Sequence, residues 1–369
     1  MHRQAKRCEV VYQFIVNIAA IYISTPTNYD IKFAVDFNAE SDKMFTTQIL
    51  SKGQKMTEMR LDHISVHKLL THMIDQACEV IIGKRKQIKL AMCCLLSGGH
   101  LLLEDLPGAG KTTLSHLIAK LLGLEFTRIQ FTSDLLPADV LGVSIFNKES
   151  GEFRFSPGPI FTQTLLADEI NRATPKAQSA LLEAMEEGQV TVDGDTRQLP
   201  KPFFVIATQN PNYQIGTFPL PESQLDRFTM CVELGYPNYE AERAILKGED
   251  RRSMIHELNA TLSDQQILSI RQSVSSLHAS DALLDYTQDI IEFTRTRPEF
   301  THGLSPRGSL ALLKSAKAWA YLDGRNHVLP EDIQEVLPPV LFHRLRDQAE
   351  DREISLDRSE LIIKSVAIP

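Results

Sequence analysis

The sequence LLLEDLPGAGKTT, residues 101–113, decides the fold of this chain. Residues 101–103 form a short apolar run typical of a buried strand, and a Gly/Pro turn leads into an amphipathic run, residues 114–122, that predicts a helix. Gly108 and Gly110 would allow backbone N–H groups to surround an anion at the start of this helix, where the helix dipole favours negative charge. The stretch therefore predicts a phosphate-binding loop.

The residues that follow the glycines extend this prediction. Lys111 adds a full positive charge, Thr112 offers a hydroxyl to Mg²⁺, and Thr113 is placed to reach an inner phosphate. Only the second half of the G-x-x-x-x-G-K-[ST] pattern is strict, because Asp105 stands where the first glycine is expected. Gly-rich turns that bind no phosphate are common, so the interpretation also depends on residues further along the chain. We predict nucleotide binding by Pro107, Gly108, Ala109, Gly110, Lys111, Thr112 and Thr113.

The composition is that of a globular protein. Its 369 residues are enough for two domains with ordinary cores, and 43% are hydrophobic while 23% are charged. A formal net charge of −8 argues against a surface built for nucleic acid and favours a protein partner. Five cysteines without C-x-x-C spacing favour buried, reduced thiols. We therefore expect a cytoplasmic protein that does not act on nucleic acid.

Residues 1–55 match no pattern in the rest of the chain. Basic residues precede an apolar run, residues 10–23, that superficially resembles a signal sequence or a membrane anchor. Gln13 and Asn17 interrupt this run, and it is shorter than the roughly 18 residues of a spanning helix. We expect a poorly structured extension without stable membrane insertion, or an upstream start, with Met56 or Met59 as the functional start.

A second junction between a strand and a polar segment carries the predicted chemistry. The aliphatic residues 164–167 end in Asp168 and Glu169, which places both carboxylates at the carboxyl end of a buried strand, where open parallel sheets bind ligands. Asp168 can hold the magnesium shell, usually through water, and Glu169 can accept a proton from the attacking water. A solvated Asp–Glu pair is the alternative, and the phosphate loop upstream disfavours it.

A third strand, residues 203–207, delivers Thr208, Gln209 and Asn210 to the same edge of the predicted sheet. An uncharged amide at this position can orient a water molecule by geometry rather than by charge. Asn before Pro211 is also an ordinary turn residue, so the functional interpretation of Asn210 rests on the neighbouring motifs.

Other patterns predict two β-hairpins and a mainly helical second half. The hairpins are expected at residues 142–155 and 189–199, around turn residues, and a polar bend is expected at 134–139. A helical pattern over 64–96 is broken at 80–84, where Ile82 and Gly83 could close over an adenine base or simply connect two helices. Further helices are predicted at residues 174–187, 220–228, 238–248, 264–278, 281–297, 305–322 and 331–337.

Two arginines lie in predicted helices, and one of them, Arg307, is a candidate for contact with a phosphate. Arg227 is expected to be exposed on the short helix at 220–228. Arg307 lies one step inside a helix that begins Ser305-Pro306, a position that the helix dipole disfavours for a cation unless an anion lies nearby.

Together these residues resemble an AAA+ ATPase, and specifically the MoxR family, from about residue 60 to the C-terminus. The two hairpins fall where this branch carries its helix-2 and pre-sensor-1 insertions, a pattern that magnesium chelatase subunits and restriction-type relatives share. The matching motifs are GAGKTT (108–113) for Walker A, LLADEINRA (165–173) for Walker B, ATQNP (207–211) for sensor 1, LDRF (225–228) for the arginine finger and SPRGS (305–309) for sensor 2.

The resemblance implies an α/β P-loop NTPase fold, in which helices flank a parallel sheet with two β-hairpin insertions and a small all-α lid domain follows. The expected ranges are 1–55 for the extension, 56–237 for the nucleotide-binding domain and 238–369 for the lid. It also implies a homo-oligomeric ring, usually a hexamer, with ATP and Mg²⁺ between subunits. Asn210 would position water, Arg227 would reach the neighbouring site, and Arg307 would report nucleotide state to the lid, in its own subunit or the next.

The function that this resemblance implies is a chaperone-like ATPase that remodels or matures a client protein. Relatives of this type work with von Willebrand A domain proteins and assist metal or cofactor insertion. The alternatives are a nucleotide-gated scaffold with little turnover, a magnesium-chelatase-like subunit, and a DNA-dependent motor. Glu169 and Arg227 together disfavour the scaffold, and the absence of a basic run disfavours the DNA motor.

Overall fold

The computed structural model describes residues 33–34, 48–49, 63–105, 108–210, 217–247, 251–258, 260–347, 352–353 and 356–368. The chain divides into two units, residues 1–61 and 62–369, and each is described by itself. In the first unit, β1 (Phe33–Ala34) pairs antiparallel with β2 (Gln48–Ile49). The remainder of the predicted extension, residues 1–55, lies outside the described residues, and the domain boundaries at 55/56 and 237/238 stay a prediction.

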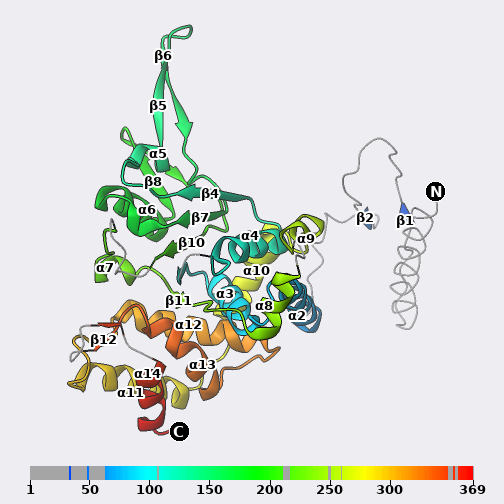
Figure 1. Ribbon diagram of the computed structural model, residues 1–369, viewed down its shortest axis with the longest axis vertical. Coiled ribbons are helices and arrows are strands. Elements are labelled where there is room, and N and C mark those ends of the chain that lie inside the picture. Colours follow the sequence, from blue (N-terminus) through cyan, green and yellow to red (C-terminus); the bar gives the residue numbers. More distant parts are fainter. Residues whose placement is uncertain are drawn as a thin grey trace. The chain divides into compact units, whose positions relative to one another are not determined.

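A five-stranded parallel sheet forms the centre of the second unit, with the strand order β11-β3-β10-β7-β4 (Figure 1). Every residue of β3, β7 and β10 is buried, as expected for parallel strands that are covered on both faces. Because these strands run in one direction, their carboxyl ends share one edge of the sheet. The strands are β3 (Leu101–Glu104), β4 (Phe126–Gln130), β7 (Thr164–Asp168), β10 (Phe204–Gln209) and β11 (Met230–Val232).

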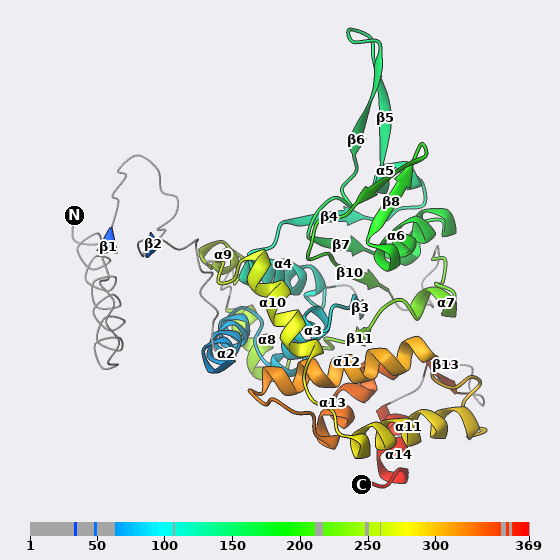
Figure 2. The same cartoon turned by 180° about the vertical axis from the view of Figure 1, so that it is seen from behind.

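Helices cover both faces of this sheet (Figures 1 and 2). On one face, Leu181 and Leu182 of α6 (Pro175–Glu187) share a buried cluster with Leu165 of β7 and Val205 of β10. Alternate strand residues, such as Leu166, point to the opposite face. The remaining helices of this part are α2 (His63–Val80), α3 (Arg85–Leu96), α4 (Lys111–Leu122), α5 (Pro137–Leu141), the 3-10 turn η1 (Ile170–Arg172) and α7 (Glu222–Leu225).

Both predicted hairpins are present. The first, β5 (Gly142–Asn147) with β6 (Glu152–Pro157), projects away from the sheet (Figures 1 and 2). The second, β8 (Gln189–Val192) with β9 (Asp195–Gln198), turns through Asp193 and Gly194, whose φ angles of 55° and 87° suit the type I′ turn favoured by right-twisted strands.

A mainly helical region follows the sheet. Ser263, Ser280 and Ser305 cap three of its helices by accepting hydrogen bonds from backbone N–H groups in the first turn. Its elements are α8 (Tyr239–Leu246), α9 (Arg251–Glu257), α10 (Asp264–Ser275), α11 (Asp281–Thr296), α12 (Pro306–Leu322), α13 (Pro330–Leu341), β12 (Arg346–Asp347), β13 (Arg352–Glu353) and α14 (Leu356–Ser365).

Several elements differ from the sequence-based expectation. Helix α13 was expected to end before Pro338 and Pro339, but it continues to Leu341, because burial of Val340 and Leu341 offsets the backbone hydrogen bonds that the prolines remove. The predicted polar bend contains helix α5, and helix α7 is shorter than expected. Strand β11 and helices α9 and α14 were not predicted, since short segments carry little periodicity.

Two features of the described residues concern membrane-spanning helices and disulfide bonds. Within the described ranges, no helix combines the length and the apolar character needed to cross a membrane. Cys93, Cys94 and Cys231 are buried and form no disulfide, as the sequence predicts, whereas Cys78 forms none either but is only partly buried.

Candidate functional site

Lys111, the first residue of α4, lies buried at the carboxyl edge of the sheet, with only 8% of its surface exposed. Its Nζ donates to Asp105 O at 2.6 Å, to Gln209 O at 3.3 Å and to Asn210 Oδ1 at 3.3 Å. Burial lowers the pKa of Lys111, and nearby carboxylates act in the opposite direction. Because all three acceptors are uncharged oxygens, this buried ammonium group suits an incoming anion.

The loop before Lys111 has the backbone shape that a phosphate site requires. Gly108 and Gly110 have φ angles of 88° and 93°, and a Cβ at either position would meet nothing within 4 Å. Glycine is therefore needed here for its conformation, while the space around it stays open. Gly110 also has no side chain to cap α4, which leaves the first-turn N–H groups, those of Thr112 and Thr113 included, for another acceptor. Pro107 lies outside the described residues.

Asp168 ends strand β7 with both carboxylate oxygens engaged. Its Oδ2 accepts hydrogen bonds from Arg128 Nη2 at 2.6 Å and Nε at 3.1 Å, and its Oδ1 accepts one from Thr208 Oγ1 at 2.6 Å. Mg²⁺ usually keeps several waters and binds through one or two carboxylates together with substrate phosphates. An Asp168 whose oxygens are already engaged fits a role in the outer shell of such an ion, and among the described residues no group of three His, Cys, Asp or Glu could hold a metal alone.

Glu169 adopts a backbone conformation that is rare for a side-chain-bearing residue, with φ 55° and ψ 49°. The left-handed region costs a non-glycine residue roughly 1–2 kcal/mol, so the surroundings must fix it. Its backbone N–H donates to Thr208 Oγ1 at 2.8 Å. Its carboxylate accepts from Asn210 Nδ2 at 3.1 Å and Gln130 Nε2 at 3.0 Å, and it pairs with Arg172 at 2.9 Å. Glu169 is therefore held at a defined position beyond the strand.

Asn210 joins the charged residues at this edge. Its Oδ1 accepts from Lys111, its Nδ2 donates to Glu169, and its backbone O accepts from Asn171 Nδ2 at 2.9 Å. We call Lys111, Asp168, Glu169, Thr208 and Asn210 the strand-edge cluster. The predicted residues Lys111, Asp168, Glu169 and Asn210 thus lie together, although the ends of two strands, β7 and β10, and the start of helix α4 supply them.

Sequence reasoning gave no role to Arg128, Asn171 or Thr208, which hold this cluster together. Arg128 lies on β4, which pairs with β7 so that Gln130 lies opposite Asp168. Thr208 bridges Asp168 and the backbone of Glu169 from the neighbouring strand. A polar residue near the end of each strand is the sequence signal that could have identified these residues. The sequence does not show which strands are neighbours, however, and the strand order of the sheet does.

Arg227 and Arg307 both pair with the carboxylate of Glu186, and we call these three residues the arginine cluster. Arg227 Nη2 lies 3.3 Å from Glu186 Oε2, and Arg307 Nη2 pairs with Glu186 Oε1. The expectation that Arg227 is exposed was wrong: its side chain is only 27% exposed, because the end of α6 packs beside it. Arg307 lies in the first turn of α12, where an anion was expected nearby, and the carboxylate of Glu186 is that anion in this chain. No hydrogen bond or ion pair between described residues joins either arginine to the strand-edge cluster.

The backbone on either side of this arginine cluster is fastened to the helical region. Asp226 Oδ2 accepts from Ser305 Oγ at 2.9 Å, and Asp226 Oδ1 accepts from Arg344 Nε at 2.7 Å. Arg344 is almost completely buried and also donates to Phe228 O at 2.5 Å. Because Asp226 precedes Arg227 and Ser305 caps the helix of Arg307, these bonds hold the two arginine-bearing segments side by side.

The turn with Ile82 and Gly83 lies beside the segment that follows β11. Lys84 Nζ donates to Tyr236 O at 2.7 Å, and a Cβ at Gly83 would approach the Asn238 side chain to 3.0 Å. Gly235 N donates to Asp105 Oδ2 at 2.6 Å, which gives Asp105 a structural role at the position where the loop pattern expects glycine. Adenine contact by Ile82 and Gly83 stays a prediction.

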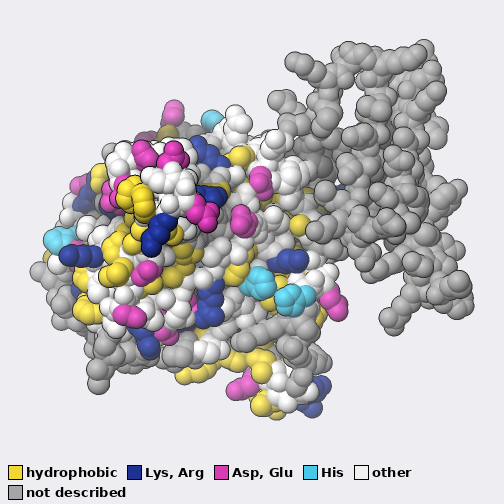
Figure 3. All heavy atoms as spheres, turned by 90° about the horizontal axis from the view of Figure 1, so that it is seen from above, with side chains coloured by type: hydrophobic (Ala, Val, Ile, Leu, Met, Phe, Trp, Pro, Cys, Tyr) yellow, Lys and Arg dark blue, Asp and Glu magenta, His cyan; other side chains and the backbone are white. Residues whose placement is uncertain are grey.

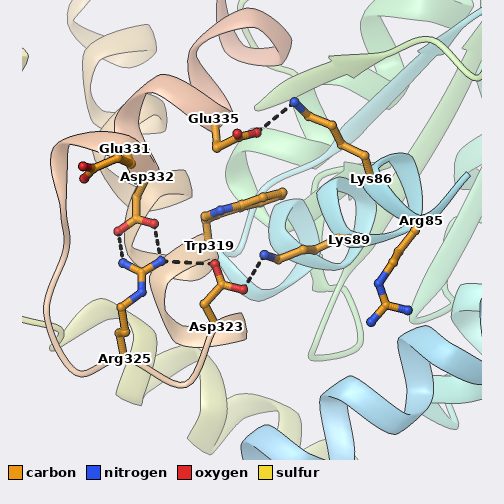
Figure 4. Close-up of a pocket in the computed structure, with 9 residues that line it drawn as sticks. All are labelled: Arg85, Lys86, Lys89, Trp319, Asp323, Arg325, Glu331, Asp332 and Glu335. Atoms are coloured by element: carbon orange, nitrogen blue, oxygen red, sulfur yellow. Dashed lines mark hydrogen bonds and ion pairs between the residues drawn. The ribbon is translucent and has the colours of Figure 1, made fainter.

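A cavity of about 540 Å³ lies elsewhere, between α3 and the segment from α12 to α13 (Figure 4). Ion pairs cross it: Lys86 to Glu335 at 2.8 Å and Lys89 to Asp323 at 2.6 Å, with Lys89 Nζ 3.6 Å from the centre of the Trp319 ring. Since its charges pair with one another and no predicted site residue lines it, we interpret it as a contact between the sheet region and the helical region.

Comparison with known proteins finds that the chain is similar to AAA-type ATPases, in agreement with the glycine loop and the strand-edge cluster. Residues 100–230 match the family described as "ATPase family associated with various cellular activities (AAA)", and residues 292–362 match the AAA lid domain. The chain is 48% identical to the uncharacterized protein YeaC of Bacillus subtilis, over 76% of this chain and 88% of that one. It is 38% identical to Chaperone MoxR1 of Mycobacterium tuberculosis, over 81% and 82%. The crystal structure of a Cytophaga hutchinsonii protein, described as a candidate ATPase, superposes with a TM-score of 0.76 at 37% identity, over 83% and 97%.

Proposed function

The chain belongs to the MoxR family of chaperone-like AAA+ ATPases, and we propose that it hydrolyses ATP in a homo-oligomeric ring to remodel or mature a client protein. The observation that carries this proposal is the strand-edge cluster. A buried lysine, a strand-end aspartate and a constrained glutamate converge on a glycine loop that is shaped for phosphate.

Each residue of the cluster would have a distinct part in the reaction. Residues 108–113 would bind the phosphates of ATP, and Thr112 with Asp168 would hold Mg²⁺, the aspartate through water. When bound, ATP supplies the phosphoanhydride to be cleaved and Mg²⁺ neutralises charge on its oxygens. Glu169 accepts a proton from the attacking water, while Asn210 keeps the carboxylate of Glu169 oriented relative to Lys111.

The arginine cluster supports a site that is shared between subunits. Arg227 and Arg307 pair with the same carboxylate, and no hydrogen bond or ion pair between described residues joins them to the strand-edge cluster. Both would therefore act on ATP bound by the neighbouring copy, so Arg307 would act in trans. Arginine fingers contribute about 10³ to 10⁵ in rate in phosphoryl transfer. A ring, hexameric in our proposal, brings each arginine cluster to the next strand-edge cluster.

The hairpin β5–β6 offers a surface for a client. Val143, Ile145, Phe146 and Phe153 are large apolar residues that the chain leaves exposed there. Figure 3, seen from the side toward which the hairpin projects, shows hydrophobic side chains gathered on this face among charged ones. A von Willebrand A domain partner, help with metal or cofactor insertion and a cytoplasmic location complete the proposal, and they rest on the resemblance of the motifs to the family.

Substitution of Glu169 by glutamine tests the proposed reaction. Glu169→Gln should keep ATP binding and reduce phosphate release to the background rate, because the amide keeps the shape of the side chain but cannot accept the proton. Nucleotide titration and phosphate release measure the two quantities. If the wild type releases phosphate well above background and the variant does so equally fast, Glu169 is not the base. If the wild type itself releases phosphate only at the background rate, a nucleotide-gated scaffold is favoured.

Mixing two inactive variants tests the shared site. Arg227→Ala subunits keep an intact strand-edge cluster, and Glu169→Gln subunits keep an intact arginine cluster. A mixture should recover part of the activity, because Glu169→Gln subunits can supply Arg227 to their neighbours.

A further inference from the structure

Glu186, near the end of α6, is placed between two arginines that come from distant parts of the chain. Its Oε2 faces Arg227, which follows α7, and its Oε1 faces Arg307, in the first turn of α12. Glu186 also lines a cavity of about 310 Å³ together with Arg227 and Gln224. Within the described structure, Arg227 Nε and Gln224 Oε1 are buried without a hydrogen-bond partner, so polar groups remain unsatisfied beside this carboxylate.

The electrostatics of this arrangement require an anion between the arginines. Two guanidinium groups on one carboxylate would repel each other without it, and Arg307 also lies at a helix N-terminus, where the dipole disfavours a cation. Glu186 compensates both charges. Its side chain is 38% exposed and that of Arg307 is 43% exposed, so water and salt weaken the pairs. A more highly charged anion, such as a triphosphate, can therefore replace the carboxylate.

The fold does not depend on Glu186 for the position of the two segments. Asp226, Ser305 and the buried Arg344 already join the backbone beside Arg227 to the start of α12. Glu186 therefore acts on the arginine side chains rather than on the path of the chain. Its effect should appear in the reaction more than in the stability of the subunit.

We propose that Glu186 is a positioning residue that holds Arg227 and Arg307 as one preorganised pair, which is transferred together to the phosphates bound by the adjacent copy. This inference rests on the proposed function, because it assumes that the arginines act across a subunit boundary. Holding both side chains in advance reduces the entropy lost when they meet the phosphates, and misplacement of such groups by about 1 Å can cost 10²-fold in rate.

Mixed oligomers test this role. The reference mixture contains Arg227→Ala subunits, which supply the strand-edge cluster, and Glu169→Gln subunits, which supply the arginines. Glu186→Gln is added either to the arginine-supplying subunits or to the Arg227→Ala subunits, and phosphate release is measured with saturating ATP. Glu187→Gln serves as the matched control, since Glu187 is the next residue and lines the same cavity.

We expect phosphate release to fall about 10- to 100-fold when Glu186→Gln is in the arginine-supplying subunits, and to stay unchanged when it is in the other subunits. Glu187→Gln should change neither mixture, and Glu186→Asp in the arginine-supplying subunits should restore part of the rate. An equal loss in both mixtures, a loss matched by Glu187→Gln, or no loss would overturn the role of Glu186. A reference mixture without any recovered activity would overturn the shared site itself, and this inference with it.

Discussion

The strand-edge cluster and the arginine cluster are built in opposite ways. In the first, Lys111 and Asp168 are buried, and the ends of parallel strands set their positions. In the second, one partly exposed carboxylate joins two partly exposed arginines that come from separate segments. Removing the partner of a buried polar group lowers the free energy of unfolding considerably, whereas an exposed ion pair contributes only about 0–1 kcal/mol to it.

In the proposed ring, this difference would suit the separate tasks of the two clusters. The strand-edge cluster would bind ATP in its own subunit, so a rigid, preformed arrangement would lower the cost of binding. The arginine cluster would exchange Glu186 for the phosphates of a neighbouring copy, and weak, partly exposed ion pairs would permit that exchange. Three further measurements test this difference between the strand-edge cluster and the arginine cluster.

The largest effect is expected in nucleotide affinity. Lys111→Ala should weaken ATP binding about 100-fold, because hydrogen bonds to a charged group contribute roughly 1.5–3 kcal/mol each. Glu186→Gln should leave the affinity of isolated subunits unchanged, since Glu186 lies outside the strand-edge cluster. Titration with a fluorescent nucleotide at low protein concentration measures both. Equal loss in the two variants would show that the clusters form one site within a subunit.

A smaller effect is expected in the free energy of unfolding. Thr208→Val keeps the shape of the side chain but removes the hydroxyl that donates to Asp168 and accepts from the backbone of Glu169. The loss should be about 1–3 kcal/mol, because two buried polar groups lose their partner. Glu186→Gln should cost less than about 1 kcal/mol. Urea unfolding followed by circular dichroism compares the two variants. Similar losses would contradict the view that the strand-edge cluster is the more rigidly held of the two clusters.

The smallest effect concerns His100, which connects the two regions. Its Nδ1 accepts from Val205 N at 3.0 Å on β10, and its Nε2 lies 3.2 Å from Met185 O, next to Glu186. Burial lowers the pKa of His100 from 6.5 to about 4. The neutral ring therefore contributes stability that is complete above pH 6.5 and is lost as the pH falls through 4, because the unfolded state binds the proton more readily.

The loss attributable to His100 between these pH values should be about 1–2 kcal/mol, reduced by the partial exposure of the residue. Urea unfolding at several pH values should show a smaller decrease in His100→Gln, whose amide can keep both hydrogen bonds without titrating. A wild-type curve parallel to that of the variant would exclude this role. The buried His343, whose pKa is also lowered by burial, titrates in both proteins and cancels in the comparison.

The sequence predicts the strand-edge cluster far better than the arginine cluster. Asp168 follows directly on an apolar run, Asn210 comes three residues after one, and Lys111 follows the glycine turn, so local patterns place each of them at a strand or loop end. Strand direction then brings them to one edge. Arg227, by contrast, was expected to be exposed, and Glu186 was not singled out, because no local pattern relates the end of α6 to the start of α12.

The same reason explains the missed elements. Strand β11 has three residues and is defined by its pairing with β3 rather than by its own periodicity. Helix α13 passes two prolines because its last turn is buried, which depends on neighbours that are remote in sequence. Asp105 departs from the loop pattern, and its bond to Gly235, a residue remote in sequence, gives it a structural role there.

The sequence by itself determined the phosphate loop, the acidic strand end, the two hairpins and the family resemblance, because these depend on residues close together along the chain. The tertiary structure alone decided which strands are neighbours, which cation holds Asp168, and that a single carboxylate joins Arg227 to Arg307. Such contacts form between segments far apart in sequence, and their energies depend on burial and distance, which no local pattern contains.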